Sequence, residues 1–413
     1  MARGALSAVA RFGAGFPALR HRNFRRYILG QGISLVGFWM QSVAQGWLVY
    51  RLSGSALALG IVSAASYLPV LCLAPVAGVI ADRVPKLRLI LVTQTLSMLL
   101  AFGLGALVAA HLVTVPLVAA FAMGLGLVGA FDLPTRQAFL VELVGAEDLP
   151  SAIAMNASIF NTARVVGPAI AGAVVAFAGE APCFLLNGAS YLAVLWALLT
   201  LDLPPHIRVA TEGPRPGFLS GLRYVRDEPM LLALLIALGA VSGLSLQFNA
   251  LLPAAAQRMF AAGATGYGML LTAFGSGAVL SALGLASSRY TREQHVRNLL
   301  FGLCLFGAGL LALGAMRRLV PALVCEVFAG FGMIRFTATT NAMLQLLVDD
   351  RYRGRIMGLH TVMFLGTAPA GSLVLGVVAE HFSVPAALLV SGTVPLITAA
   401  WLARRLVGAR APG

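Results

Sequence analysis

Ionisable side chains inside long apolar runs are the first candidates for chemistry in this sequence. Glu326 is the only acidic residue well inside such a run, about seven residues, or roughly 10 Å at 1.5 Å per residue, from one end. Arg164 lies about thirteen residues, or roughly 20 Å, from the end of its own run that lies on the other side of the membrane. In a hydrocarbon core of about 30 Å these depths coincide. An ion pair that breaks when the protein rearranges would couple proton uptake by Glu326 to that change. The alternatives are a static ion pair and a protonated acid bonded to a carbonyl.

Polar side chains also line one face of three apolar runs, within an arc of about 100° at 100° per residue. The run 27–50 carries Gln31, Ser34, Gln41, Ser42 and Gln45; the run 230–252 carries Ser242, Ser245 and Asn249; the run 319–345 carries Glu326, Thr337, Thr340 and Asn341. Amide and hydroxyl groups beside apolar walls suit a neutral or amphipathic organic molecule. They suit a phosphate or nucleotide poorly, because no basic cluster accompanies them. The alternative is that these side chains only bridge neighbouring helices.

The composition places these residues in a membrane. Of 413 residues, 59% are apolar and 11% charged, whereas soluble domains average about 25% charged residues. The mean hydropathy is +0.89. These values exclude a water-soluble enzyme and predict an all-α integral membrane protein.

Twelve runs are long enough to cross a bilayer, which needs about 20 mostly apolar residues. They span approximately 27–50, 55–80, 89–110, 115–134, 152–178, 183–201, 230–252, 266–288, 298–316, 319–345, 356–379 and 384–407. We therefore expect a basic N-terminus over 1–26, six-helix halves over 27–201 and 230–407, a proline-containing linker over 202–229 and a short tail over 408–413. The halves share a weak repeat, because at an offset of 204 residues Ala138 and Leu140 fall on Ala342 and Leu344.

The charge distribution orients the helices. The net charge is +14, and 23 of the 29 basic residues fall in segments on one side, with four on the other side and two within runs. Basic residues accumulate on the cytoplasmic side of membrane proteins. The sequence therefore predicts cytoplasmic termini in a bacterial inner membrane, and it requires no nucleic acid to explain the charge. The first run is too long for a signal-peptide core, so we expect it to stay in the mature protein.

Several motifs carry a family resemblance. The segment after the second run reads Gly78-Val-Ile-Ala-Asp82-Arg83-Val-Pro85-Lys86-Leu-Arg88, and the fifth run contains Gly167-Pro168. Three further stretches are Leu19-Arg-His-Arg-Asn-Phe-Arg-Arg26, Phe131-Asp-Leu-Pro-Thr-Arg-Gln137 and Arg353-Gly-Arg-Ile-Met-Gly358. Together they resemble the major facilitator superfamily, and within it the secretion-effector branch that includes enterobactin exporters and macrolide and multidrug efflux pumps. The resemblance implies two pseudo-symmetric halves around a central cavity lined by the first, fourth, seventh and tenth spans. The fourth span differs from the other three because it carries few polar residues, and Met123, with its polarizable thioether, is its candidate contact with the substrate.

The loop between the second and third runs predicts a conformational latch. Gly78 would let a neighbouring helix approach, and Asp82 would accept hydrogen bonds from the free N–H groups that begin the eleventh span. Asp132 and Arg136 lie on one helix face at i,i+4, so Arg83 could bridge Asp82 to Asp132. The alternative is ordinary juxtamembrane charge that only sets orientation.

These observations favour a secondary active exporter of a small organic molecule, a drug-like compound or a siderophore, by alternating access with proton antiport. A lipid flippase or importer of the same fold and a non-transporting receptor are the alternatives. The sequence contains no nucleotide-binding GxxxxGK[ST] loop. The six histidines are scattered and the four cysteines show no ligand spacing, so we expect no enzyme activity, cofactor or metal. The expected partners are the substrate, protons and the lipid bilayer, and the expected state is a monomer.

Overall fold

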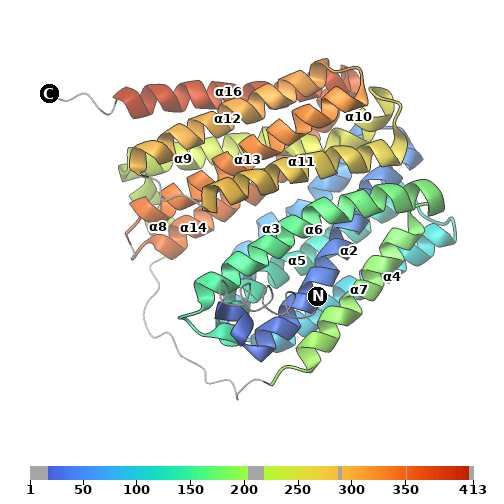
Figure 1. Cartoon of the computed structure of the whole chain (residues 1–413), viewed down its shortest axis with the longest axis horizontal. Helices are drawn as coiled ribbons and strands as arrows, with labels where there is room; N and C mark the ends of the chain where they lie inside the picture. Colours follow the sequence, from blue (N-terminus) through green and yellow to red (C-terminus); the bar gives the residue numbers. More distant parts are fainter. Residues whose placement is uncertain (1–16, 203–217, 287–290, 350, 409–413) are drawn as a thin grey trace, which may run out of the picture. The chain divides into compact units, whose positions relative to one another are not determined.

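The computed structural model describes residues 17–202, 218–286, 291–349 and 351–408, and within these ranges it contains helices and no strands (Figure 1). The first part of the chain holds η1 (Pro17–Arg20), α2 (Arg22–Ser53), α3 (Ala56–Arg83), α4 (Lys86–Ala109), α5 (Val115–Val144), α6 (Leu149–Ala178) and α7 (Ala181–Leu199). The second part holds α8 (Phe218–Asp227), α9 (Pro229–Ala240), η2 (Val241–Ser245), η3 (Leu246–Leu251), α10 (Leu252–Arg258), α11 (Gly263–Ala286), α12 (Arg292–Ala315), α13 (Leu319–Leu347), α14 (Arg353–Thr361), η4 (Val362–Gly366), α15 (Ala368–His381) and α16 (Val384–Gly408). The all-α prediction is confirmed.

Eleven helical segments of the described chain are long and apolar enough to cross a membrane. Two of them contain breaks: the segment Pro229–Arg258 joins α9 to α10, and the segment Arg353–His381 joins α14 to α15. The remaining predicted span, α2, has 32 residues, about 48 Å of helix at 1.5 Å per residue. Its glutamines lower its mean hydropathy, so length alone supports α2 as the twelfth span.

The chain divides into two compact units. Unit 1 comprises Met1–Ala44, Cys72–Val113 and Gly124–Val209, and unit 2 comprises Gln45–Leu71, Thr114–Met123 and Ala210–Gly413. The predicted division into halves at 202–229 stays a prediction, and residues 203–217 of that linker lie outside the described residues. The rest of the linker is not a plain connection, because α8 occupies Phe218–Asp227.

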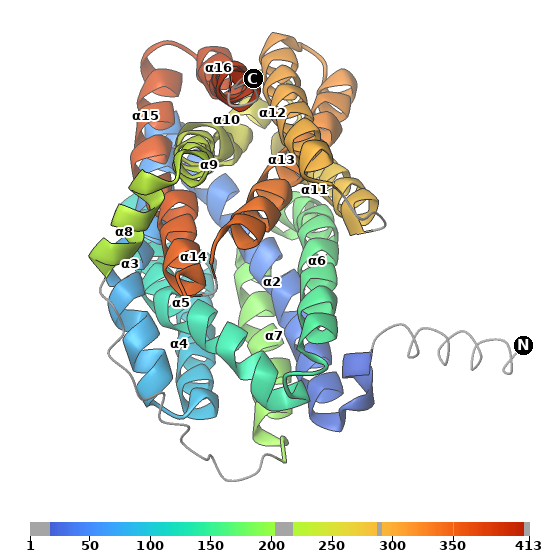
Figure 2. The same cartoon turned by 90° about the vertical axis from the view of Figure 1, so that its left-hand side faces the viewer.

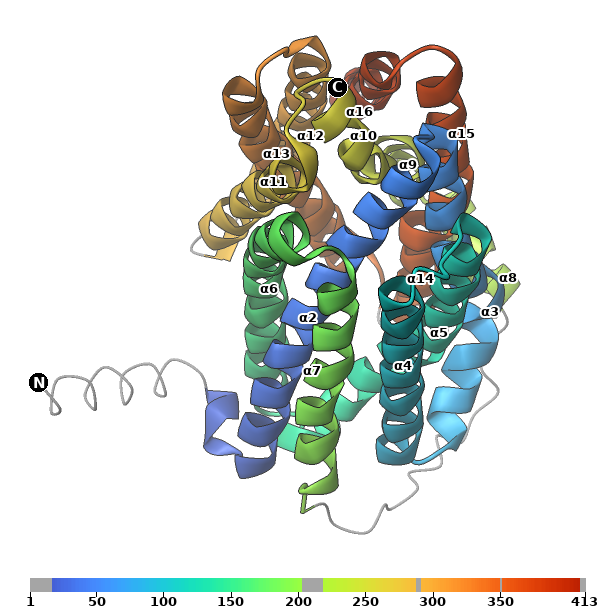
Figure 3. The same cartoon turned by 90° about the vertical axis from the view of Figure 1, so that its right-hand side faces the viewer.

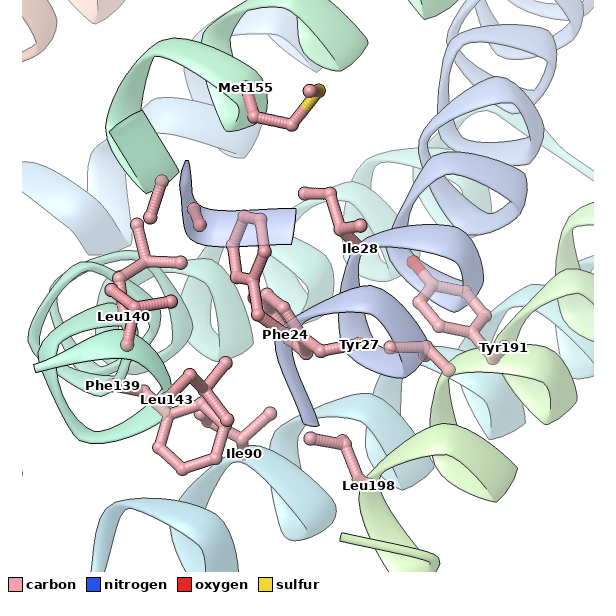
Figure 4. Packing of buried hydrophobic residues seen from close by; sticks show 14 of the residues in the cluster. Phe24, Tyr27, Ile28, Ile90, Phe139, Leu140, Leu143, Met155, Tyr191 and Leu198 are labelled. Atoms are coloured by element: carbon pink, nitrogen blue, oxygen red, sulfur yellow. The ribbon is translucent and has the colours of Figure 1, made fainter. Parts of the chain in front are cut away.

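Unit 1 has an apolar core where the ends of α2, α4, α5, α6 and α7 meet (Figure 4). Phe24, Phe139 and Ile90 are fully buried in it, and the rings of Tyr27 and Phe139 meet edge to face at 5.9 Å. In unit 1, α2 runs between α6 and α7 (Figure 3). Gly167 of the Gly-Pro motif explains the approach of α6, because a Cβ there would lie 2.5 Å from the Trp39 Cβ of α2.

Unit 2 is built around α13, which packs closely against α11 and α12. A Cβ added at Gly309 of α12 would lie 3.0 Å from the Ala329 nitrogen of α13, and one added at Gly330 would collide with the Phe274 carbonyl of α11. Such contacts between helix backbones require residues without side chains. Aromatic rings fill the space beside them, where Phe248 meets Phe274 and Phe306 edge to face.

Candidate functional site

A charged cluster around a buried carboxylate lies in the second half of α5 in unit 1. Asp132 is 5% exposed, and its Oδ2 lies 2.6 Å from Nε of Arg136, one helical turn later. The other oxygen, Oδ1, accepts hydrogen bonds from the Thr93 hydroxyl at 2.7 Å and the Gln94 amide at 2.9 Å, both on α4. The i,i+4 pairing predicted from sequence is therefore present. The cluster fixes α4 against α5 through a carboxylate whose two oxygens both have partners.

The other residues of the predicted latch are not assembled in the same way. Arg83 is exposed, so the expected bridge from Arg83 to Asp132 is replaced by Arg136, which lies on the same helix as the buried acid. A Cβ at Gly78 would meet open space among the described residues, so the close helix approach expected there is not seen. The Asp82 side chain lies outside the described residues, and its predicted role stays a prediction.

The stretch Leu19–Arg26 attaches the start of the chain to unit 1. His21 Nε2 lies 2.7 Å from Asp148 Oδ2, before α6. Asn23 donates to the Asp202 carbonyl at 2.7 Å, and Arg26 donates to the Thr200 carbonyl at the end of α7, also at 2.7 Å. The stretch Leu19–Arg26, which carries part of the family resemblance, therefore binds the start of α6 and the end of α7.

The polar stripe of α2 divides by burial. Gln31, Ser34 and Gln41 are buried, Gln45 is half-buried and Ser42 is exposed. The Gln41 Oε1 accepts a hydrogen bond from Asn187 of α7 at 2.7 Å, so this residue bridges two helices. In contrast, the buried Gln31 Oε1 has no hydrogen-bond partner among the described residues.

We expect Asn187→Ala to lower the free energy of unfolding by about 0.6 kcal/mol, with ~1.7 kcal/mol as the upper bound, which are the average and maximum for hydrogen bonds between membrane helices. Reversible unfolding in detergent measures this change. The apparent affinity for cargo stays at the wild-type value, because the Gln41–Asn187 bond is structural. A tenfold loss of cargo affinity with unchanged stability would instead place Gln41 in the binding site.

The second stripe lies where the helix of the seventh span is broken. After α9 the backbone widens into the π-helical turn η2 and then narrows into the 3-10 segment η3, which leads into α10. Figure 2 labels α9 and α10, the two helices on either side of this break. The hydroxyls of Ser242 and Ser245 are fully buried and have no hydrogen-bond partner among the described residues. Asn249 is half-buried and donates to the Leu246 carbonyl at 3.2 Å. Widened turns inside helices are frequent at functional sites, and η4 repeats the feature in the eleventh span.

The third stripe lies on α13. Glu326 is fully buried, and neither carboxylate oxygen has a hydrogen-bond partner among the described residues. Thr340 is buried and Thr337 is half-buried, and both hydroxyls donate to carbonyls of their own helix, Phe336 and Met333. The half-buried Asn341 accepts a hydrogen bond from Gln345 at 3.2 Å. Glu326 is thus the one member of this stripe that is left without a partner within the described chain.

Arg164 and Met123 complete the predicted set. The Arg164 guanidinium lies 5.7 Å from the Trp39 ring centroid, a cation–π contact between α6 and α2 within unit 1. Glu326 belongs to unit 2, so the predicted Glu326–Arg164 pair stays a prediction. Met123 on α5 is exposed.

Comparisons with known proteins agree with the helical architecture. The model of the family described as transmembrane secretion effector matches residues 13–409. The staphyloferrin A transporter of Staphylococcus aureus is 26% identical over 84% of this chain and 87% of its own. The multidrug efflux pump Tap of Mycolicibacterium fortuitum is 27% identical over 87% and 88%. The enterobactin exporter EntS of Shigella boydii is 27% identical over 86% and 85%.

Solved structures share the fold at low identity. A bacterial homologue of the human lysosomal transporter Spinster, in an inward-facing and unoccupied conformation, has a TM-score of 0.72 and 13% identity over 93% of this chain and 96% of its own. The nucleoside transporter NupG has a TM-score of 0.70 and 16% identity over 92% and 98%.

Proposed function

Because the chain belongs to the transmembrane secretion effector family of the major facilitator superfamily, we propose that this membrane transporter exports a small organic molecule by alternating access. The bilayer is a bacterial inner membrane, and both termini are cytoplasmic, as the distribution of arginines favours. The protein works as a monomer and carries no cofactor.

The buried hydroxyl and amide groups without partners support this proposal most directly. An unsatisfied polar group inside a membrane protein costs free energy unless something binds it. Ser242, Ser245 and Gln31 each have such a group. Neutral donors and acceptors beside apolar walls select an amphipathic cargo, and the relatives named for multidrug efflux and for siderophores fit that chemistry.

Glu326 is the proposed coupling residue. An isolated ionised carboxylate buried in hydrocarbon is costly, so this acid is neutral in the arrangement described. Ionisable residues inside membrane spans commonly serve proton relays. When Glu326 becomes exposed to the cytoplasmic side, it would release its proton there. Proton entry would then be coupled to cargo exit.

Competition for transport tests the cargo class. We expect several chemically unrelated amphipathic compounds to compete with one another in vesicles containing the purified protein. Ser242→Ala should change the apparent affinities several-fold, because it removes a group from the stripe. Ser281→Ala is the matched control, since this hydroxyl on α11 is also buried without a partner but lies outside the three stripes. Strict selectivity for one inorganic ion would contradict the proposal, and movement of lipids or net import would favour the alternative roles.

A further inference from the structure

The turn between α2 and α3 is held from both sides by charged groups of α10 and α15, all within unit 2. Helix α2 ends at Ser53, and Gly54 follows with φ of +62°, donating its N–H to the Tyr50 carbonyl at 2.7 Å. Helix α3 begins at Ala56. The turn therefore presents the negative end of one helix dipole beside the positive end of the next.

Glu380, in the last turn of α15, caps the start of α3. Its Oε2 accepts hydrogen bonds from the backbone N–H of Ala56 at 2.8 Å and of Leu57 at 3.5 Å. The Ser55 hydroxyl accepts from the N–H of Ala58 at 3.2 Å. The first three N–H groups of α3, which have no partner within the helix, are thus satisfied, two of them by a residue more than 320 positions away in the chain.

Arg258, the last residue of α10, holds the end of α2. Its Nη2 donates to the Gly54 carbonyl, and its Nε donates to the Tyr50 hydroxyl at 3.3 Å. The same Nη2 lies 4.0 Å from Glu380 Oε2. A cation therefore sits at the negative helix end and an anion at the positive end, and the two attract each other.

Close backbone packing continues this contact along α3 and α15. A Cβ at Gly376 would lie 3.2 Å from the Ala56 carbonyl oxygen and 3.3 Å from the Gly60 Cα, and a Cβ at Gly60 would collide with the Ser372 carbonyl. A larger residue therefore does not fit at Gly60, and one at Gly376 would crowd the start of α3. The turn is consequently fixed in register, with Glu380 directly at the N-terminus of α3.

We propose that Glu380 and Arg258 form a latch that closes the predicted outer side of the transporter. The turn belongs to the first predicted half (27–201) and the two charged residues to the second (230–407), so separation of the halves at this end must break all of these contacts together. This inference rests on alternating access as proposed above. When the latch is broken, the end of α2 loses Arg258 and the start of α3 loses Glu380. The free energy of these contacts therefore stabilises the outward-closed state.

Distance measurements between spin labels test the latch without any substrate. The labels are placed at Leu112 and Val320, which are 64% and 73% exposed and lie at the predicted outer ends, in a background with all four cysteines replaced. We expect Glu380→Ala to raise the ratio of long to short distances about tenfold, because it removes a charged cap and its ion pair. Glu380→Gln keeps an acceptor oxygen and should raise the ratio about threefold, and Arg258→Gln should act in the same direction.

Glu147→Gln is the control, because this acid is exposed and lies between the fourth and fifth predicted runs, on the predicted inner side. It should leave the distance distribution unchanged. If Glu380→Ala does not fold, the Gln variants carry the test. Wild-type distances in Glu380→Gln and Arg258→Gln would overturn the latch even if cargo transport is normal. If the latch variants change the distances as expected but the protein moves no cargo, the proposed function is overturned and the latch is not.

Discussion

Arg136→Met is expected to lower the free energy of unfolding by about 3–5 kcal/mol, which is the usual cost of removing one partner of a buried ion pair. Asp132 is nearly inaccessible and would keep only the Thr93 and Gln94 hydrogen bonds on Oδ1. Its Oδ2, now 2.6 Å from Arg136, would lose that charged partner. Arg136 also forms a hydrogen bond with the Tyr27 side chain, so the loss should loosen the core that contains Tyr27 (Figure 4). Reversible unfolding in mixed detergent micelles measures the change.

The double variant Asp132→Asn/Arg136→Met separates charge from packing. It should recover more than half of the lost stability, because no uncompensated charge remains buried. Arg83→Met is the matched control: Arg83 is an exposed arginine of the same unit, and its replacement should change stability by less than about 0.5 kcal/mol. Equal effects of Arg83→Met and Arg136→Met would contradict the assignment of Arg136 as the structural partner of the buried Asp132 carboxylate.

Glu326→Gln is expected to abolish the response of transport to an imposed pH gradient while substrate exchange continues. The amide has nearly the shape of the neutral acid, so the variant should fold and bind cargo normally. It cannot release a proton, so the step that requires ionisation is lost. Gradient-driven uptake in proteoliposomes should fall to the level seen without a gradient, a loss of at least tenfold.

Glu147→Gln serves again as the control and should keep the full response to the gradient. Exchange of labelled for unlabelled substrate, measured at equal pH on both sides, shows that the Glu326 variant remains competent. Wild-type gradient-driven uptake by Glu326→Gln would show that another group couples proton movement to transport. Loss of both exchange and coupling would assign Glu326 a structural role.

The sequence predicted most of the fold because apolar runs of membrane length are unambiguous. The run 27–50, which forms most of α2, was predicted from its mostly apolar residues although its glutamines reduce its hydropathy, and Asp132–Arg136 followed from the i,i+4 spacing. The linker helix α8 was missed, because ten residues that include two arginines and an aspartate are too short and too charged to give a membrane signal.

The remaining features depend on contacts between distant segments. The partners of Asp132 on α4 are 38 and 39 residues away, and the Gln41–Asn187 bond joins residues 146 apart. Helical periodicity says which side of a helix a residue faces, and it does not identify the neighbouring helix. The π-helical turns η2 and η4 are equally hidden, because one extra residue in a turn leaves composition and hydropathy unchanged. Glu380 gave no signal because it lies at the end of its span, where an acid is common.

Uptake of an amphipathic dye by proteoliposomes containing only the purified wild-type protein tests the central claim most directly. With an acidic lumen, no ATP and the dye outside, we expect transporters inserted with their cytoplasmic side outward to concentrate the dye inside above its external level. A protonophore should collapse this accumulation. Absence of dye movement in either direction, with or without the gradient and with the protein shown to be folded, would contradict the assignment as a secondary active exporter of organic molecules.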